Sequence, residues 1–260
     1  MGRGLTKASI VAAALGLLDE VGLDGLTVRA VAARLGVQAP ALYWHVRSKQ
    51  DLLDEMATQI WQGIGEQLAA LPPDLGWRQE MIAFASITRR TLLAHRDGAK
   101  VFTGTYLTDA SVLENQEAGL SRMMDQGFTL ADVIRAYSLL YSFVIGFCIE
   151  EQAVAQATAA GDDRYALERR AARLDQEAHP LTVQAGPEIF ADPDGRFEDL
   201  VGMIVQATDG MRGSPLRSAA RVAAAAAATA ARQRRLSELG LGPPVRRAGP
   251  AARPPAGPGG

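Results

Sequence analysis

The stretch QAPALYWHVRSKQDLL, residues 38–53, decides the fold, because its composition does not suit an ordinary core helix. Tyr43, Trp44 and His45 stand together, and the basic Arg47 follows at once. Aromatic side chains are usually buried, and basic side chains usually remain in water. Both kinds in one short segment indicate a surface that meets another molecule.

Helix signals lie within this stretch and beyond it. Pro40 is tolerated in the first turn of a helix, so a short helix is predicted to run from there to about His45. Ser48 followed by Asp51 is a capping box, which opens a long helix predicted to end near Ala70.

Two more helices are predicted before this stretch. The first runs from about Leu5 to about Val21 with an apolar face at helical spacing, and Thr6 can cap its start. The second begins after Thr27 and stops at Gly36. Short helices joined by a tight turn at Gly36 match a helix-turn-helix, whose recognition helix lies in the DNA major groove.

The remainder also reads as helical, with no alternating strand pattern bounded by turns. Pro72 and Pro73 break the long helix. Further helices are predicted near 76–95, 97–104, 109–126, 129–157, 164–178 and 194–212. The predicted fold is all-α, an N-terminal three-helix bundle with a helix-turn-helix followed by an α-helical core.

Charge is distributed unevenly over the 260 residues, although the net charge is only −2. Residues 25–50 hold four basic side chains and no acid, and residues 51–212 are acidic. A basic block suits a polyanion such as DNA, but a short window also drifts by a few charges without any function. Both interpretations stay open on charge alone.

The tail from 214 is rich in Ala, Pro, Gly and Arg, a composition that predicts disorder. It is a functionless extension, a source of nonspecific phosphate attraction, or a partner-binding segment. Cys148 is the single cysteine, so an intrachain disulfide is excluded. The start lacks an apolar signal core, and the apolar run 136–149 is shorter than a membrane span, so we expect a cytoplasmic protein.

The helix-turn-helix assigns roles around the third helix. Leu42 and Val46 are expected in the core, while Trp44 is either partly buried or exposed. Tyr43 and Lys49 are expected on phosphates, and small residues let the helix approach base edges. The expected DNA-binding residues are Thr27, Arg29, Gln38, Ala39, Pro40, Ala41, Tyr43, Trp44, His45 and Lys49.

A family resemblance supports this interpretation. The segment GLTVRAVAARLGVQAPALYWHVRSKQDLLDEMA resembles the N-terminal domain of TetR-family repressors, and within that family the tetracycline repressors. LLAHRDGAKVFTGT (92–105), LENQ (113–116), QGF (126–128) and GFCIEEQ (146–152) resemble segments of their core. The resemblance implies a homodimer, in which the helices near 129–157 and 194–212 of the two copies pack together. It also implies that the dimer binds a palindromic operator, and that a small effector releases it by moving the linker helix.

This resemblance divides the chain into four parts. The expected boundaries are 1–49 for the DNA-binding domain, 50–70 for the linker helix, 71–213 for the effector-binding and dimerisation domain, and 214–260 for the tail. The resemblance also places the effector pocket. Its expected lining residues are Phe84, Thr88, Phe102, Thr105, Tyr106, Gln116, Phe147 and Glu150.

The chain departs from the tetracycline repressors within that pocket. Phe102 stands where they have a metal-ligating histidine, and Gly65 stands where a histidine contacts the drug. Because hard cations need oxygen or imidazole ligands, we expect a hydrophobic or aromatic effector other than magnesium–tetracycline. Ala39 and Ala41 replace polar base-reading residues, so we also expect a different operator.

The sequence carries few residues suited to catalysis. Glu150, Glu151 and His95 are the only candidates for acid–base chemistry, and no nucleophile, base and orienting group occur together. Residues 95–97 are instead expected to end one helix and cap the next. We expect no enzyme activity, catalytic residue, metal or cofactor. An activator or a non-repressing dimeric adaptor remains an alternative to a repressor.

Overall fold

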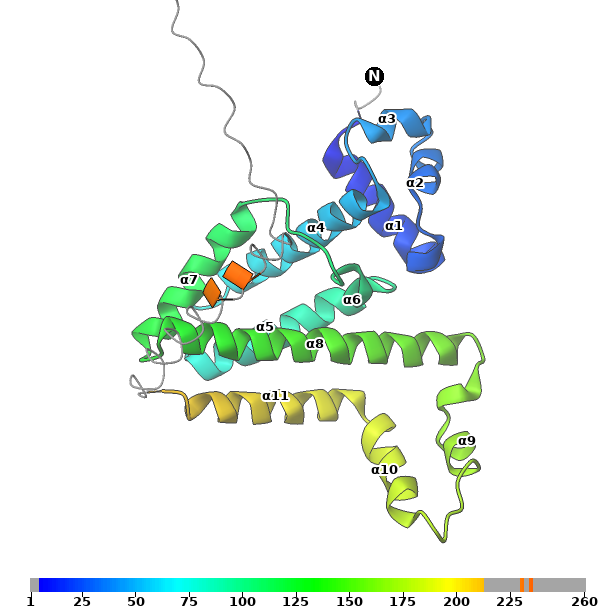
Figure 1. The fold of residues 1–260 in the computed structure, drawn as a ribbon, viewed down its shortest axis with the longest axis vertical. Helices are drawn as coiled ribbons and strands as arrows, with labels where there is room; N and C mark the ends of the chain where they lie inside the picture. Colours follow the sequence, from blue (N-terminus) through cyan, green and yellow to red (C-terminus); the bar gives the residue numbers. More distant parts are fainter. Residues whose placement is uncertain (1–4, 213–229, 232–233, 236–260) are drawn as a thin grey trace, which may run out of the picture. The chain divides into compact units, whose positions relative to one another are not determined.

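The computed structural model describes residues 5–212, 230–231 and 234–235. Within these residues the chain forms eleven α-helices, one 3-10 helix and no strand, which confirms the all-α prediction (Figure 1). The chain divides into two units, Met1–Gly213 and Ser214–Gly260. The predicted disorder of the tail lies outside the described residues, apart from four positions.

The helices follow one another in the order shown in Figure 1. They are α1 (Lys7–Gly25), α2 (Val28–Arg34), α3 (Ala39–Tyr43), α4 (Lys49–Ala69), α5 (Trp77–Leu93), α6 (Gly98–Val101), α7 (Ser111–Asp125), α8 (Leu130–Ala159), α9 (Leu167–Ala171), α10 (Pro180–Phe190) and α11 (Pro193–Asp209), with the 3-10 helix Asp163–Tyr165 before α9.

Local sequence fixes where several of these helices begin. The hydroxyl of Thr6 accepts a hydrogen bond from the Ser9 amide and forms a capping box. The hydroxyls of Thr27, Ser48 and Thr129 likewise accept an amide in the first turn of α2, α4 and α8. The predicted capping box at Ser48 is only half formed, because the Asp51 carboxylate accepts the Arg47 amide instead of that of Ser48. Each cap satisfies one of the free N–H groups at a helix start, which stabilises the helix by about 1 kcal/mol.

The turn between α2 and α3 is set by Gly36, whose φ is 68°. The Gly36 amide donates to the Ala33 carbonyl, and the Val37 amide donates to the Ala32 carbonyl. This pattern is a Schellman motif, which ends a helix at a residue in the left-handed conformation. A glycine adopts that conformation without strain, so the helix-turn-helix geometry depends on this residue.

The boundaries differ from prediction in the N-terminal half. Gly22 has a φ of 72° and interrupts α1, but the helix resumes and continues to Gly25. The third helix ends at Tyr43 rather than His45, and only Gly98–Val101 of the predicted helix 97–104 is helical. Asp97 is the N-cap residue of α6, as predicted for residues 95–97, but its side chain makes no capping hydrogen bond to that helix.

The segment between α8 and α11 also differs. A single helix was predicted near 164–178, but the chain forms a 3-10 turn and the short α9 there, and α10 was not predicted. The carboxylate of Asp175 accepts the amides of Glu177 and Ala178. Asp often competes with helix formation through such local bonds. Pro180 then occupies the first turn of α10, where proline is favoured.

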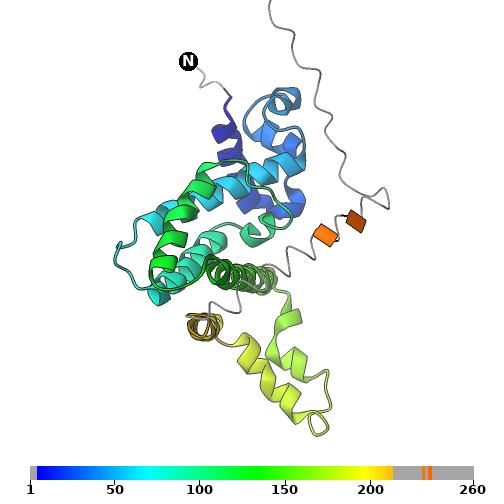
Figure 2. The ribbon, with the colours of Figure 1, turned by 60° about the vertical axis from the view of Figure 1, so that its left-hand side comes forward.

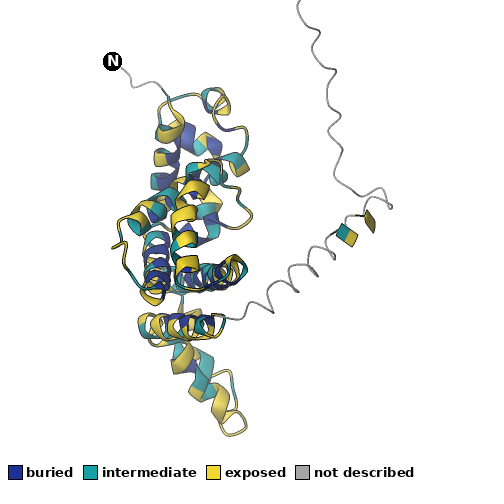
Figure 3. Cartoon of the chain, turned by 90° about the vertical axis from the view of Figure 1, so that its left-hand side faces the viewer, coloured by how far each residue is buried: buried dark blue, intermediate teal, exposed yellow. Residues whose placement is uncertain are grey.

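The core is built around α8, which packs on α5, α6, α7 and α11. Figures 1 and 2 show α8 and α11 side by side, and Figure 3 shows that buried and exposed residues alternate along these helices. Leu140 and Val144 are fully buried, but Leu139 is 49% exposed. One face of α8 is therefore exposed in the single chain. By length and composition alone α8 could cross a membrane, a property that buried core helices share.

Candidate DNA-binding and effector sites

Helix α3 and the three residues after it combine two buried side chains with exposed aromatic ones. Leu42 and Val46 are fully buried, as predicted. Trp44 is 89% exposed and Tyr43 is 47% exposed, which resolves the open question about Trp44. His45 is exposed as well. Because Leu42 and Val46 fix the helix, the neighbouring aromatic side chains are held on the outside.

The other predicted DNA-binding residues surround this face. Thr27, Arg29, Gln38, Pro40 and Lys49 are exposed, and Ala39 and Ala41 are half-buried. Most of these side chains are therefore accessible to a large partner such as a DNA duplex.

Two of these residues already hold the domain together. The Thr27 hydroxyl accepts the Ala30 amide at 3.1 Å. The Lys49 ammonium donates to the Leu23 carbonyl at 2.8 Å and joins the start of α4 to the end of α1. An ammonium has three donors, so this contact leaves Lys49 able to bind a phosphate at the same time.

A cavity of about 550 Å³ lies among α4, α5, α7, α8 and the segment after α6. Five aromatic side chains form much of its wall, namely Trp61, Phe84, Phe102, Tyr137 and Tyr141. Trp61 is central, since its ring lies 6.1 Å from Phe84, 6.0 Å from Phe102 and 5.6 Å from Tyr141, centroid to centroid. All three pairs are edge-to-face, an arrangement that aromatic rings favour.

The cavity contains only part of the predicted effector pocket. Phe84, Phe102, Thr105 and Gln116 line it. The other four lie elsewhere, in four different settings. Thr88 is fully buried, Tyr106 is 74% exposed, Phe147 packs on Phe143 and Phe197, and Glu150 is exposed.

The polar part of the cavity wall is an ion pair between α5 and α7. Arg122 Nη2 donates to Glu80 Oε1 at 2.6 Å, and the Glu80 side chain is only 6% exposed. The hydrogen bond to Glu80 raises the pKa of Arg122. Burial, and then the charge of Glu80, raises the pKa of the Tyr137 hydroxyl well above its usual range. Glu80 and Arg122 therefore pair with each other in the cavity wall.

Sequence reasoning missed the side chains that contribute most to this wall. Tyr137 and Tyr141 are four residues apart on α8, a spacing that places them on one helix face. Trp61 is a single large aromatic in a mostly polar segment of α4. This isolated tryptophan is the sequence feature that could have indicated an aromatic cavity beside α4. In the part of the chain that the structure describes, no group of three or more His, Cys, Asp or Glu side chains is placed to hold a metal.

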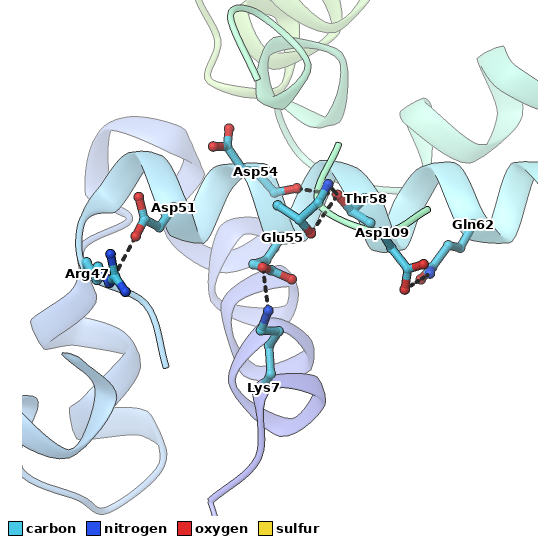
Figure 4. A network of polar contacts seen from close by, with 9 residues as sticks. Lys7, Arg47, Asp51, Asp54, Glu55, Thr58, Gln62 and Asp109 are labelled. Atoms are coloured by element: carbon cyan, nitrogen blue, oxygen red, sulfur yellow. Dashed lines mark hydrogen bonds and ion pairs between the residues drawn. The ribbon is translucent and has the colours of Figure 1, made fainter. Parts of the chain in front are cut away.

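The linker helix α4 is bonded to the segment after α6 along one face (Figure 4). Gln50, Asp54, Thr58 and Gln62 are spaced by four residues, which is about one helical turn. Gln50 donates to the Gly104 carbonyl at 3.3 Å, and Asp54 accepts the Tyr106 amide at 3.0 Å. Further along, Thr58 accepts the Thr108 amide at 2.9 Å, and Gln62 donates to Asp109 at 3.1 Å. We call these four contacts the α4 ladder.

A second connection joins the core to α1. Asp97, in the left-handed conformation with φ 57°, accepts the Leu23 amide at 3.0 Å and pairs with Lys100 at 2.7 Å. A Cβ at Gly22 would lie 3.0 Å from Asp97 Oδ2, so glycine permits this close approach. Burial alone would raise the pKa of Asp97, but bonds from Lys100, Leu23 and Gln156 lower it.

Comparisons with known proteins agree with this architecture. Residues 10–56 match the family of bacterial regulatory proteins, tetR family. Residues 70–208 match the tetracyclin repressor-like C-terminal domain. The chain is 38% identical over 205 residues to tetracycline repressor protein class A from transposon 1721 of Escherichia coli, covering 77% of this chain and 89% of that protein.

Two solved structures illustrate the similarity. One is a possible TetR family transcriptional regulator from Streptomyces coelicolor A3(2), with a TM-score of 0.70 and 32% identity over 80% of this chain and 100% of that one. The other is TetR(class A) in complex with 5a,6-anhydrotetracycline and magnesium, with a TM-score of 0.61 and 31% identity over 80% of this chain and 100% of that one. This chain belongs to the TetR family of DNA-binding transcription regulators.

Proposed function

We propose that this protein is a homodimeric repressor that binds a palindromic operator in the cytoplasm. A small hydrophobic or aromatic effector, other than magnesium–tetracycline, releases it from DNA. The observation that carries the proposal is the aromatic cavity behind α4, the helix that also begins beside the exposed face of α3. One helix is thereby in contact with both sites.

An exposed apolar face supports the homodimer. Leu139 of α8 is 49% exposed and Met203 of α11 is 64% exposed. A Cβ built at Gly146 or Gly202 meets no atom of the described chain within 4 Å, so the surface there is open to close approach. Two copies that pack these helices together bury this apolar surface, and a two-fold dimer matches a palindromic site.

The cavity wall argues against a magnesium chelate. Phe102 is buried to 8% exposure and offers no ligand atom where the related repressors are expected to have a histidine. Gly65 lines the cavity, and a Cβ there would lie 3.2 Å from Asn115 Nδ2. The glycine therefore widens the cavity at a position where a larger side chain would press on α7.

The α4 ladder connects the cavity to the helix that leads to the DNA-binding domain. Phe102, Thr105 and Leu107 line the cavity and belong to the segment whose next residues bond to α4. An effector that displaces this segment changes the bonding partners of α4. Release requires that the effector bind the released conformation more tightly than the DNA-bound one.

The test is a mobility-shift and footprinting experiment on the DNA upstream of the protein's own gene. The proposal predicts two protected half-sites one helical turn apart, about 34–36 Å. It also predicts loss of that complex in the Trp44→Ala variant. Binding to this DNA no tighter than to unrelated DNA would favour the non-repressing adaptor, and higher transcription with the protein bound would favour an activator.

The choice of effector is tested separately by a fluorescence titration with magnesium and tetracycline. We expect no saturable binding in the submicromolar range. Submicromolar affinity would contradict this part of the proposal and leave the DNA-binding part intact.

A further inference from the structure

The cavity offers hydrogen-bond donors that the protein itself does not use. Tyr137 and Tyr141 both line it, and no hydrogen bond within residues 5–212 involves either phenol hydroxyl. Burial raises the pKa of both hydroxyls, so both remain neutral donors at physiological pH. Both tyrosines are partly buried side chains of the cavity wall, and a phenol hydroxyl with no partner in the protein can donate to an acceptor on a ligand.

The two tyrosines also set a spacing. They lie four residues apart on α8, and side chains in this relation have Cβ atoms about 5–6 Å apart. Trp61, Phe84 and Phe102 surround them with aromatic faces and edges. A flat, fused-ring molecule with two oxygen acceptors a few ångströms apart fits this combination.

The charges of the cavity favour a neutral ligand. Glu80 and Arg122 are bonded to each other through three contacts of 2.6 to 3.3 Å. A ligand carboxylate would have to compete with Glu80 for Arg122, and a ligand cation would have to compete with Arg122 for Glu80. The remaining charged lining residue, Glu114, is exposed. Leaving one partner of a buried ion pair without its counter-ion is costly, so a charged ligand is penalised.

We propose that the effector is a neutral, fused-ring aromatic molecule whose two oxygen acceptors receive hydrogen bonds from Tyr137 and Tyr141. This inference rests on the proposed function only in assigning the cavity to the effector. A volume of about 550 Å³ is within the range of sites for drug-sized ligands.

The experiment uses four matched probes with the full-length protein, followed by quenching of tryptophan fluorescence. The first is 2-(hydroxymethyl)anthraquinone, which is neutral and carries two ring carbonyls. Two others share its ring frame but carry a carboxylate or a trimethylammonium group, and 9-anthracenemethanol lacks the carbonyls. We expect the neutral diketone to bind at least about tenfold more tightly than each of the others. Equal or tighter binding of any other probe would overturn the proposal, as would no binding of the diketone below about 100 μM.

Variants locate the hydrogen bonds. Tyr137→Phe and Tyr141→Phe each remove one oxygen and keep the ring. Because a hydrogen bond contributes about 1 kcal/mol, each change should weaken diketone binding about fivefold and leave 9-anthracenemethanol unchanged. Tyr106→Phe is the matched control, since Tyr106 is 74% exposed and lies outside the cavity. Unchanged diketone affinity in both cavity variants, with unchanged thermal unfolding, would overturn the proposal.

Failure of this inference is distinguishable from failure of the proposed function. If a charged compound releases the protein from its upstream DNA, the inference of a neutral ligand is refuted, but the proposal of an effector-responsive repressor stands. The diketone could also bind with the predicted pattern and yet have no effect on DNA affinity at any concentration. That result would support the ligand site and refute its role as an effector site.

Discussion

The DNA-binding domain and the cavity both hold large aromatic side chains that the protein does not fully bury, but they differ in what surrounds them. Trp44 stands on the surface of the DNA-binding domain and is 89% exposed. Trp61 stands inside the core, half-buried, with rings on three sides. An exposed aromatic suits a large partner, and an enclosed one suits a small molecule. The two settings therefore match the two partners of the proposed function.

The largest expected effect on stability distinguishes the buried Leu42 from the exposed Trp44 that follows α3. Leu42→Ala removes a fully buried side chain and should lower the free energy of unfolding by about 2–5 kcal/mol. Trp44→Ala should leave that free energy within about 0.5 kcal/mol of wild type, because surface changes have small effects. Urea unfolding measures both. A large destabilisation by Trp44→Ala would show that this ring has a structural role.

The next effect concerns the ion pair of the cavity. Glu80→Gln leaves Arg122 without its counter-charge, and we expect a loss of about 1–3 kcal/mol in the free energy of unfolding. Partial exposure of Arg122, whose side chain is 32% exposed, keeps this below the cost for a fully buried pair. Glu114→Gln is the control, because Glu114 is an exposed lining residue of the same cavity. Equal thermal unfolding of the two variants would contradict the assigned role of the pair.

A smaller effect tests the connection between the two regions. Asp97→Asn keeps an acceptor for the Leu23 amide and tolerates the left-handed conformation, but loses the charge that pairs with Lys100. We expect a loss of about 1 kcal/mol at pH 7. Because folding lowers the pKa of Asp97, its contribution is present above the ordinary carboxyl value of 3.8 and is lost as the pH falls below it. Unfolding curves of wild type and variant should therefore converge in acid, and a constant gap would refute the assignment.

The smallest effect concerns a single phosphate contact. Lys49→Ala should weaken binding to all DNA sequences and reduce the slope of log affinity against log salt by about one. The same change removes the bond to the Leu23 carbonyl, so unfolding must be measured beside it. A change in preference for one base, with an unchanged salt slope, would show that Lys49 reads a base instead.

Much of the DNA-binding domain was predictable because its signals are local. The caps at Thr6, Thr27 and Ser48 and the turn at Gly36 each depend on a few neighbouring residues. The exposure of Trp44 was not predictable, because it depends on the angle at which α3 packs against α2. Periodicity alone cannot give that angle.

The cavity was less predictable because its parts are distant in sequence. Phe84, Phe102, Thr105 and Gln116 were expected from a family resemblance and line the cavity. The Glu80–Arg122 pair joins residues 42 positions apart and has no local signal. Trp61 and Tyr141 lie on different helices, and only tertiary packing brings their rings to 5.6 Å, so their role does not follow from sequence spacing.

Acrylamide quenching of Trp44 tests most directly whether the exposed face of α3 is the DNA-binding surface. The signal of Trp44 is the difference between the wild-type protein and Trp44→Phe, since Trp61 and Trp77 are common to both. We predict strong quenching in the free protein, because Trp44 is 89% exposed, and protection when the upstream DNA is bound. DNA binding seen by fluorescence anisotropy, with unchanged quenching of Trp44, would contradict the account.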